Sequence, residues 1–433
     1  TLDYEMSSLL VTELRRQGIR VEMDTEVTSF QPEGKGFSAI LSNGRELPAD
    51  TAVLSIGVKP NSELAKTAGL ELGTRGHIVT DQELRTSDPD IYAVGDVIEV
   101  TDPIFGGRTA IALAGPANRQ GRMAADNITG RHSQYQGTIG TSVIKVGRLT
   151  AGMTGYSERR LASMDVPYHK IYLHPNSNAS YYPGGAQLHM KVIFGHDGKL
   201  FGAQIVGAKG VDKRIDVISS AVWNGKKIQE LAELELAYAP PYASAKDPVN
   251  LAGMIGENVI GGLTRLAHFD SLPDGCFLLD VREKAEFELG SLPGARNIPL
   301  GDLRKRLAEL PRGRMIYIFC QSGLRGYVAE RILAQHSFDA VNLSGGYLTW
   351  KMFQPLQATP PDPVKKETGR PVLAVCKKQL DVRALACPGP VVRLKQEMDN
   401  LNAGESLELL APQSFDVDLM NWIKSSGNEL VSQ

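Results

Sequence analysis

The feature of this sequence that most constrains its fold is a cysteine placed between an apolar, β-branched run and a helical pattern. Residues 315–319 predict a strand, and residues 327–334 follow a helical period. Cys320 therefore lies where a strand ends and a helix begins. Unpaired backbone N–H groups and the positive end of the helix dipole favour an anion at such a place. A thiol there is pushed toward its thiolate form.

The loop after this cysteine contains residue types that suit an anion cradle. Gly323 and Gly326 let the backbone curl around the sulfur, and Arg325 adds a fixed positive charge. Four residues separate Cys320 from Arg325, one fewer than in cysteine phosphatases. The shorter loop fits one sulfur atom better than a phosphoryl group. The alternative is a buried structural cysteine at a strand end. The predicted loop residues are Gln321, Ser322, Gly323, Leu324 and Gly326.

The flanking sequence resembles a single-domain rhodanese over residues 265–355. The matching segments are residues 278–282, 286–287, 293–299 and 343–350. This resemblance implies that Cys320 accepts a sulfane sulfur as a persulfide, while the loop amides and Arg325 stabilise the charge. We therefore predict an α/β rhodanese domain over residues 264–355.

The whole chain limits the remaining possibilities. A length of 433 residues predicts about three domains. The net charge of -2, from 47 basic and 49 acidic residues without a basic run, argues against nucleic acid as a partner. No run is apolar enough to span a membrane, and four cysteines are too few for a disulfide scaffold. With no signal peptide, we expect a cytoplasmic protein. The start at Thr1, inside structured sequence, suggests a fragment.

Residues 1–132 read as part of a nucleotide-binding α/β domain. We expect a helix over residues 6–18, strands over residues 19–23 and 52–57, and a hairpin turn at Asn43-Gly44. The strand of residues 52–57 ends at Gly57. The glycine-rich phosphate fingerprint that should come before such a unit is missing from the sequence.

A second strand, residues 91–94, is predicted to end at Gly95-Asp96 and to place a carboxylate at a sheet edge, where a sugar-like hydroxyl could bind. The alternative is a plain turn aspartate. Residues 80–97 resemble the second FAD motif of flavin-dependent pyridine nucleotide-disulfide oxidoreductases. The resemblance implies that Asp96 binds the ribityl chain of FAD, that NAD(P)H is the reductant, and that the helix at residues 116–121, just after Ala114, points at the flavin. The predicted cofactor-binding residues are Gly57, Gly95, Asp96 and Ala114.

Residues 138–260 predict an α+β domain with strands over 141–146, 191–194 and 200–207 and a helix over 212–223. The same resemblance identifies it as a dimerisation domain and implies a homodimer. Asp247-Pro248 predicts a further helix start.

Two tyrosine-containing loops, residues 181–184 and 238–250, lie in this domain. Tyrosines held by prolines either pack at an interface or give a substrate a hydrogen bond or proton. The two loops resemble the CoA-disulfide reductase branch, which implies that Tyr182 and Tyr238 reach the partner subunit's active site. Tyr181 remains an alternative to Tyr182, and Tyr242 is a weaker match.

That branch also uses a glycine-rich FAD loop and a single redox cysteine, and the sequence contains neither. Cys276 lies in the rhodanese region and cannot serve. We therefore do not expect the chain to reduce a substrate by itself unless such residues precede Thr1.

Residues 356–372 are rich in proline and charge and predict an extended linker. Residues 373–433 then predict a small, two-layer α+β domain. Cys387 lies between a strand and a helix that opens at Pro388 or Pro390. The alternative is a half-buried cysteine at a cap. The segment resembles the TusA-like sulfur carriers, although Ala384 replaces a usual glycine. We expect a strand over 406–411 and a helix over 416–425, a structural role for Cys376, and a C-terminus cut before a last strand.

The leading hypothesis is a multidomain α/β protein. An FAD-dependent CoA-disulfide or persulfide reductase would use NAD(P)H, and Cys320 and Cys387 would transfer sulfane sulfur as persulfides. Its expected partners are coenzyme A derivatives, low-molecular-weight thiols and other sulfur carriers. One alternative is an NAD(P)H oxidase acting on oxygen. The other is a non-catalytic docking module, against which the intact pair of Cys320 and Arg325 argues. The choice between NADH and NADPH and the sulfur donor and acceptor remain open.

Overall fold

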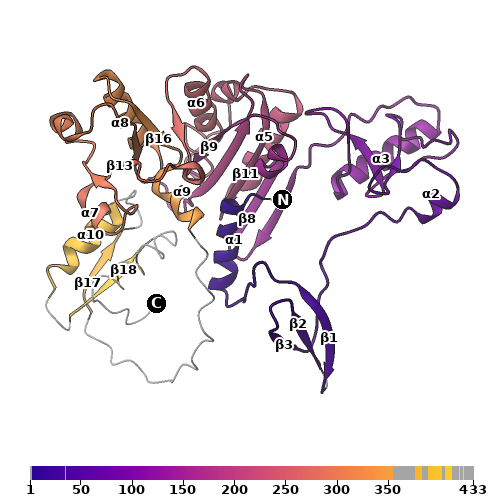
Figure 1. The fold of residues 1–433 in the computed structure, drawn as a ribbon, viewed down its shortest axis with the longest axis horizontal. Helices are drawn as coiled ribbons and strands as arrows, with labels where there is room; N and C mark the ends of the chain where they lie inside the picture. Colours follow the sequence, from indigo (N-terminus) through magenta and orange to yellow (C-terminus); the bar gives the residue numbers. More distant parts are fainter. Residues whose placement is uncertain are drawn as a thin grey trace. The chain divides into compact units, whose positions relative to one another are not determined.

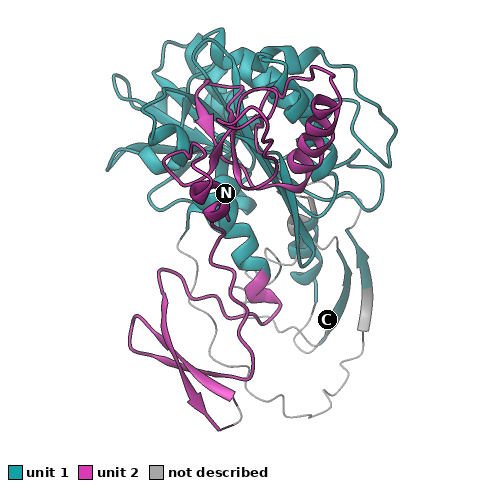
Figure 2. Ribbon diagram, turned by 90° about the vertical axis from the view of Figure 1, so that its right-hand side faces the viewer, with its two compact units in different colours: residues 1–13, 141–433 teal, residues 14–140 magenta. Residues whose placement is uncertain are grey.

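The structure, a computed structural model, describes residues 2–34, 36–354, 376–382, 389–401, 405–411, 419 and 423. The chain divides into two compact units (Figure 2). Unit 1 comprises residues 1–13 and 141–433, and unit 2 comprises residues 14–140. No helix in the described ranges is long and apolar enough to cross a bilayer.

A five-stranded antiparallel sheet in the order β7-β8-β11-β10-β9 forms the first part of unit 1 (Figure 1). Its strands are β7 (Ser142–Val146), β8 (Leu149–Gly155), β9 (His169–Leu173), β10 (Leu188–Phe194) and β11 (Leu200–Gly207). The predicted strands of this domain and the antiparallel pairing of β10 with β11 are confirmed. All of β11 is buried, because helices cover both faces of the sheet.

The two faces of β8 illustrate this layering. A Cβ atom added at Gly152 would lie 2.7 Å from Ile215 of α5 (Val211–Trp223). The neighbouring Ala151 points to the other face and packs with Met6 of α1 (Tyr4–Arg16). Because neighbouring side chains of a strand point to opposite faces, these two contacts show one helix on each face of the sheet. Both helices were predicted from their periodicity.

The remaining helices of this part are α4 (Glu158–Ala162), the 3-10 helix η1 (Ile228–Glu233) and α6 (Pro248–Ile260). Asp247 caps α6 by accepting a hydrogen bond from the N–H of Val249 at 3.0 Å, so the predicted helix start is confirmed. The same carboxylate receives two hydrogen bonds from buried Arg214, 2.8 and 3.3 Å long.

A parallel sheet in the order β12-β16-β15-β13-β14 follows. Its strands are β12 (Leu266–Ala267), β13 (Phe277–Asp280), β14 (Arg296–Asn297), β15 (Ile316–Phe319) and β16 (Ala340–Leu343). Its helices are η2 (Phe269–Ser271), α7 (Lys284–Glu288), η3 (Leu303–Lys305), η4 (Leu307–Glu309), α8 (Leu324–Gln335) and α9 (Gly346–Phe353). Apolar side chains of β13, β15 and α8 form one buried core beside Cys320. The predicted strand, cysteine and helix therefore occur in the predicted order.

The last described segment of unit 1 is a parallel pair, β17 (Cys376–Asp381) and β18 (Ser406–Leu410), with α10 (Gly389–Met398). Leu380, Val382 and Leu394 form its buried core. The strand expected over 406–411 is confirmed. Cys387 lies outside the described residues, as does almost all of the helix expected over 416–425, and the side chain of Cys376 is not described.

Unit 2 contains two small sheets. One consists of β1 (Val27–Glu33), β2 (Gly36–Leu41) and β3 (Glu46–Ala49), and the other of β4 (Ile78–Val79), β5 (Ile98–Thr101) and β6 (Arg108–Thr109). Its helices are α2 (Glu63–Thr67) and α3 (Ala114–Ile128). The predicted turn at Asn43-Gly44 is confirmed, because Gly44 has φ 80° and the N–H of Leu41 donates to the carbonyl of Arg45 at 2.9 Å.

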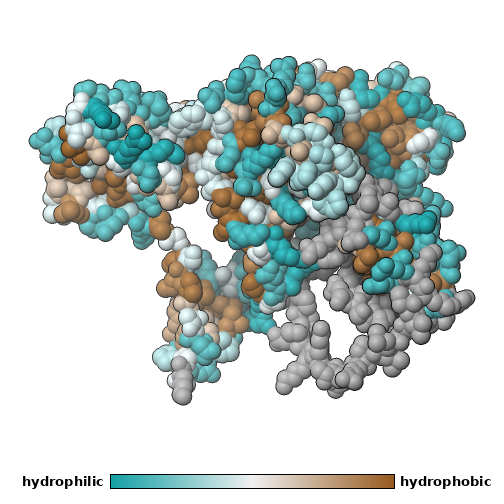
Figure 3. Space-filling model, turned by 180° about the vertical axis from the view of Figure 1, so that it is seen from behind, coloured by the Kyte–Doolittle hydropathy of each residue, from teal (hydrophilic) through white to brown (hydrophobic). Residues whose placement is uncertain are grey.

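Three predicted strands of unit 2 are wrong. Residues 19–23 and 52–57 pair with no strand in the described chain, and residues 91–94 make only the bridge between Arg85 and Tyr92. An apolar run becomes a strand only where a neighbour supplies the ladder. Val53, Leu54 and Ile56 instead have 88%, 70% and 92% of their surface exposed. Apolar surface is visible at several places on the molecule (Figure 3).

Candidate functional site

Cys320 directly follows the last residue of β15 and is 1% exposed. The N–H of Gly323 donates a hydrogen bond to its Sγ at 3.2 Å. Gly323 is the N-cap of α8 and has φ 102°, a conformation that favours glycine. The sulfur therefore lies at the N-terminus of a twelve-residue helix, where backbone donors and the dipole stabilise a negative charge.

The loop around the sulfur is supported from β16. Asn342 donates from Nδ2 to the carbonyl of Gly323 at 3.1 Å. A Cβ atom at position 326 would lie 2.3 Å from Asn342 Oδ1, so Gly326 permits this close approach. Among the predicted loop residues, Leu324 has its side chain 71% exposed and Gly326 is buried.

Gln321 is held by Arg282, which lies just after β13. Arg282 forms a buried ion pair with Asp280, at 2.6 Å between Nη2 and Oδ2. Its other terminal nitrogen donates to Gln321 Oε1 at 3.4 Å. The guanidinium also lies over the ring of Tyr347, 4.2 Å from the centroid. This fixed arginine positions a side chain of the loop.

Arg325 pairs with Glu286 of α7. Both terminal nitrogens donate to the carboxylate, at 2.7 and 2.8 Å. Glu286 Oε2 also accepts the N–H of Glu283 at 3.0 Å, which completes a capping box of α7. The loop arginine is therefore fixed by a helix that precedes it in sequence. A direct role for Arg325 in stabilising a persulfide stays a prediction.

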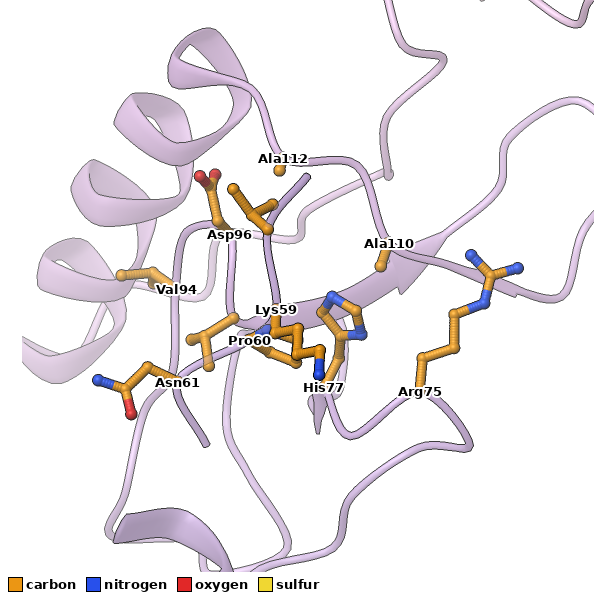
Figure 4. Close-up of a pocket in the computed structure, with 11 residues that line it drawn as sticks. Lys59, Pro60, Asn61, Arg75, His77, Val94, Asp96, Ala110 and Ala112 are labelled. Atoms are coloured by element: carbon orange, nitrogen blue, oxygen red, sulfur yellow. The ribbon is translucent and has the colours of Figure 1, made fainter. Parts of the chain in front are cut away.

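Unit 2 contains a pocket of about 670 Å³ that includes Asp96 (Figure 4). The lining residues are Val58, Lys59, Pro60, Asn61, Arg75, His77, Val94, Asp96, Val97, Ala110 and Ala112. Of the other predicted cofactor residues, Gly57 precedes this lining with φ 104°, and Gly95 has φ 85°. The N–H of Gly95 donates to buried Gln120 of α3 at 2.7 Å, and Ala114 is the first residue of that helix.

The chemistry of this pocket fits a dinucleotide. Lys59 and Arg75 offer positive charge to phosphate, and Asp96 offers an acceptor to a hydroxyl. Valine and alanine side chains offer apolar contact. His77 has a buried Nδ1 without a hydrogen-bond partner in the described chain, so a polar group in the pocket could pair with it. Sequence reasoning missed Arg75 and His77, which lie outside the recognised motif.

The structure also brings two of the loop tyrosines together. The hydroxyl groups of Tyr181 and Tyr238 are 3.1 Å apart, and this hydrogen bond raises the pKa of Tyr238. Tyr182 and Tyr242 are exposed as well, at 42% and 75%. The partner of Tyr238 in this subunit is thus Tyr181 rather than Tyr182. The proposed roles of these tyrosines stay predictions.

Cys276 does not belong to the site. It lies just before β13, is partly exposed, and burial raises the pKa of its thiol.

Known families match four parts of the chain. Residues 1–121 match the pyridine nucleotide-disulphide oxidoreductase family, and residues 141–248 match the dimerisation domain of that family. Residues 266–353 match the rhodanese-like domain, and residues 378–433 match the sulfurtransferase TusA family. The chain belongs to the pyridine nucleotide-disulphide oxidoreductases and carries rhodanese and TusA domains. The predicted multidomain α/β fold class is therefore confirmed.

Two solved oxidoreductase structures are similar to this chain. The reduced CoADR-RHD of Bacillus anthracis is 42% identical, with a TM-score of 0.79 over 81% of this chain and 64% of that chain. The NAD-dependent persulfide reductase from A. fulgidus is 38% identical, with a TM-score of 0.75 over the same shares.

Curated relatives match over 58% of this chain. They include an NADH oxidase of Methanocaldococcus jannaschii, 35% identical, and a coenzyme A disulfide reductase of Staphylococcus epidermidis, 31% identical. The chain spans 56% and 57% of their lengths. The family implies FAD and NAD(P)H as cofactors.

Proposed function

We propose that the rhodanese domain transfers sulfane sulfur through Cys320, and that the flavoprotein region belongs to a reductase of CoA disulfides or persulfides. The observation that carries the proposal is the position of Cys320 Sγ, 3.2 Å from the N–H of Gly323 at the start of α8. A terminal persulfide sulfur is an anion of the kind that such amides stabilise.

The sulfur-transfer step is a displacement. The Cys320 thiolate attacks the outer sulfur of a donor persulfide or thiosulfate, a new S–S bond forms at Cys320, and the donor bond breaks to release a thiolate or sulfite. A thiol acceptor then takes the outer sulfur by the same chemistry and returns Cys320 to its thiolate. Cys387 is a candidate acceptor, and the linker of residues 356–372 would raise its local concentration.

The reductase region would turn a persulfide R–S–SH into RSH and H₂S at the expense of NAD(P)H and one proton. A bound flavin supplies the two-electron transfer for this chemistry. From this chain, Asp96 would hold a cofactor hydroxyl and Lys59 and Arg75 would hold phosphate oxygens. Tyr182 and Tyr238 would bind substrate across a homodimer interface.

Cyanide-dependent release of sulfur tests the Cys320 assignment. We expect Cys320→Ser to abolish thiocyanate formation from thiosulfate. Cys276→Ser, which removes the other described thiol of this domain, should keep it. Turnover by Cys320→Ser at the wild-type rate would contradict the proposal.

A second candidate is an NAD(P)H oxidase, favoured by the 35% identity to the Methanocaldococcus jannaschii NADH oxidase. Oxygen uptake separates the two functions. In the full-length flavin-loaded protein, we expect CoA persulfide to be reduced faster than oxygen at equal NAD(P)H. Faster reduction of oxygen would favour the oxidase.

A further inference from the structure

The N-terminus of α9 contacts the Cys320 loop on one side and β9 of the dimerisation domain on the other. Gly345 and Gly346 have φ 71° and 61°. A Cβ atom at Gly346 would lie 2.3 Å from the carbonyl oxygen of Cys320. A Cβ atom at Gly345 would lie 2.8 Å from Cβ of Tyr172, a residue of β9. A side chain at either position would therefore collide, and glycine lets the N-terminus of α9 approach both the Cys320 loop and β9 closely.

On one side, the first amides of α9 hold the loop. The N–H of Tyr347 donates to the carbonyl of Cys320 at 2.7 Å, and the N–H of Leu348 donates to that of Gln321 at 3.0 Å. In a trans peptide the C=O and N–H groups point in opposite directions. Fixing these two carbonyls toward α9 therefore turns the N–H groups of Gln321 and Ser322 away from α9.

On the other side, residues at the end of β9 hold α9. Oγ1 of Thr349 lies 2.7 Å from Nε2 of His174, and Nδ1 of His174 lies 2.9 Å from Nδ1 of His189. The N–H of Tyr172 donates to Oγ of Ser344 at 2.9 Å. Thr349 is 1% exposed and His174 is 7% exposed, so the contact between them is shielded from water.

The surroundings of the imidazole pair favour its neutral form. Burial, together with neighbouring His189, holds the pKa of His174 well below its ordinary value, and burial lowers the pKa of His189 to about 4. Both rings are therefore neutral at pH 7. One Nδ1 donates to the other, and Nε2 of His174 pairs with the Thr349 hydroxyl in either tautomer arrangement.

We propose that Thr349 and His174 are positioning residues for the sulfur-transfer reaction at Cys320. Their hydrogen bond fixes the N-terminus of α9, and α9 fixes the peptide groups that surround the sulfur. This inference rests on the proposed sulfurtransferase function. It means that the dimerisation domain of the flavoprotein contributes to the rhodanese reaction through β9, although none of its residues is required to touch the sulfur.

Thr349→Val in the full chain is the direct test, because valine keeps the shape of threonine and removes the hydroxyl. A neutral hydrogen bond of this kind corresponds to a fall of about 3- to 10-fold in kcat for thiocyanate formation. The KM for thiosulfate should change by less than about twofold, because Thr349 is 1% exposed and acts only through the loop that it positions. Thr349→Ser, which restores the hydroxyl, should restore kcat.

The matched control is Thr154→Val. Thr154 is 1% exposed in β8, and its hydroxyl lies 2.7 Å from that of Thr141, so the variant loses a hydroxyl hydrogen bond of the same length elsewhere. Hydrogen exchange of the peptide that contains residues 320–323 adds a structural readout. It should accelerate in Thr349→Val and remain as in wild type in Thr154→Val.

Equal kcat and equal exchange in Thr349→Val and Thr154→Val would overturn the positioning role. If Thr349→Val does not fold, Ser344→Ala removes the acceptor of the Tyr172 N–H and must show the same loss of kcat. An inactive Cys320→Ser beside a fully active Thr349→Val would refute this inference alone. An active Cys320→Ser would refute the proposed function itself.

Discussion

The two terminal nitrogens of Arg325 lie 2.7 and 2.8 Å from the two carboxylate oxygens of Glu286. This pair joins the start of α8 to α7, and the side chain of Glu286 is 5% exposed whereas that of Arg325 is 26% exposed. The loop arginine therefore has a defined position before any sulfur arrives. Its geometry depends on a residue that precedes it by 39 positions.

Removing the charge of Glu286 should loosen this arrangement. Glutamine at position 286 can keep the capping box of α7 but cannot form the charged pair. We expect Glu286→Gln to lower the free energy of unfolding by about 1–3 kcal/mol, since hydrogen bonds to charged groups contribute this much. Urea unfolding measures it, and thiocyanate formation should fall in the same variant because Arg325 loses its fixed position.

The control for this change is Glu288→Gln on the same helix. Glu288 is 45% exposed and makes ion pairs with Lys284 at 3.7 Å and Lys395 at 3.3 Å. Exposed pairs contribute about 0–1 kcal/mol. A loss of stability in Glu288→Gln as large as that in Glu286→Gln would contradict the special role of the loop pair.

Breaking the buried ion pair of Asp280 and Arg282 should lower the stability more than breaking the pair of Glu286 and Arg325. Asp280 is fully buried and Arg282 is 2% exposed, so Asp280→Asn leaves a cation without its counter-charge. Breaking a buried pair in this way costs about 3–5 kcal/mol. We expect a lower urea midpoint, and Asp302→Asn, at an exposed turn, should leave the midpoint unchanged. If the urea midpoint of Asp280→Asn shifts no more than that of Asp302→Asn, the prediction is wrong.

The parts of the site that could be predicted from sequence are those built from neighbouring residues. Cys320, Gly323 and Gly326 lie within one strand-loop-helix segment, whose local pattern already defines the geometry. The cap at Asp247 and the turn at Asn43-Gly44 are local in the same sense.

Contacts between distant residues could not be predicted in this way. Thr349 and His174 are 175 positions apart, and no period or motif joins them. The strand prediction for residues 52–57 was wrong for a related reason. Their apolar run carries the signature of a buried strand, but a strand also needs a paired neighbour, and the run itself contains no information about one.

The lowered pKa of His189 predicts how stability depends on pH. The ordinary pKa of a histidine is 6.5, and burial lowers the pKa of His189 to about 4. Between pH 6.5 and 4, His189 is therefore protonated in the unfolded chain but still neutral in the folded chain. Its contribution to the free energy of unfolding is complete above about pH 6.5 and is lost as the pH drops toward 4. At pH 5 the loss for this group is about 2 kcal/mol.

Urea unfolding at pH 7 and pH 5 measures this dependence. We expect His189→Gln to weaken it, because glutamine does not titrate. His132→Gln is the control, since the side chain of His132 is 75% exposed. An unchanged difference between the two pH values in His189→Gln would exclude this histidine as the cause.

Glycine 346 provides a test of the close approach behind the sulfur. Its φ of 61° disfavours a side chain, and a Cβ atom would lie 2.3 Å from the carbonyl oxygen of Cys320. Gly346→Ala must therefore move the peptide group of Cys320, and we expect it to abolish most thiocyanate formation. Gly313→Ala is matched in backbone, with φ 70°, but nothing lies within 4 Å of its added Cβ. It should cost about 1 kcal/mol of stability and leave the activity intact, because the strain of a positive φ is then the sole effect. Activity retained by Gly346→Ala would mean that the loop tolerates displacement of the carbonyl, which would also weaken the positioning role of α9.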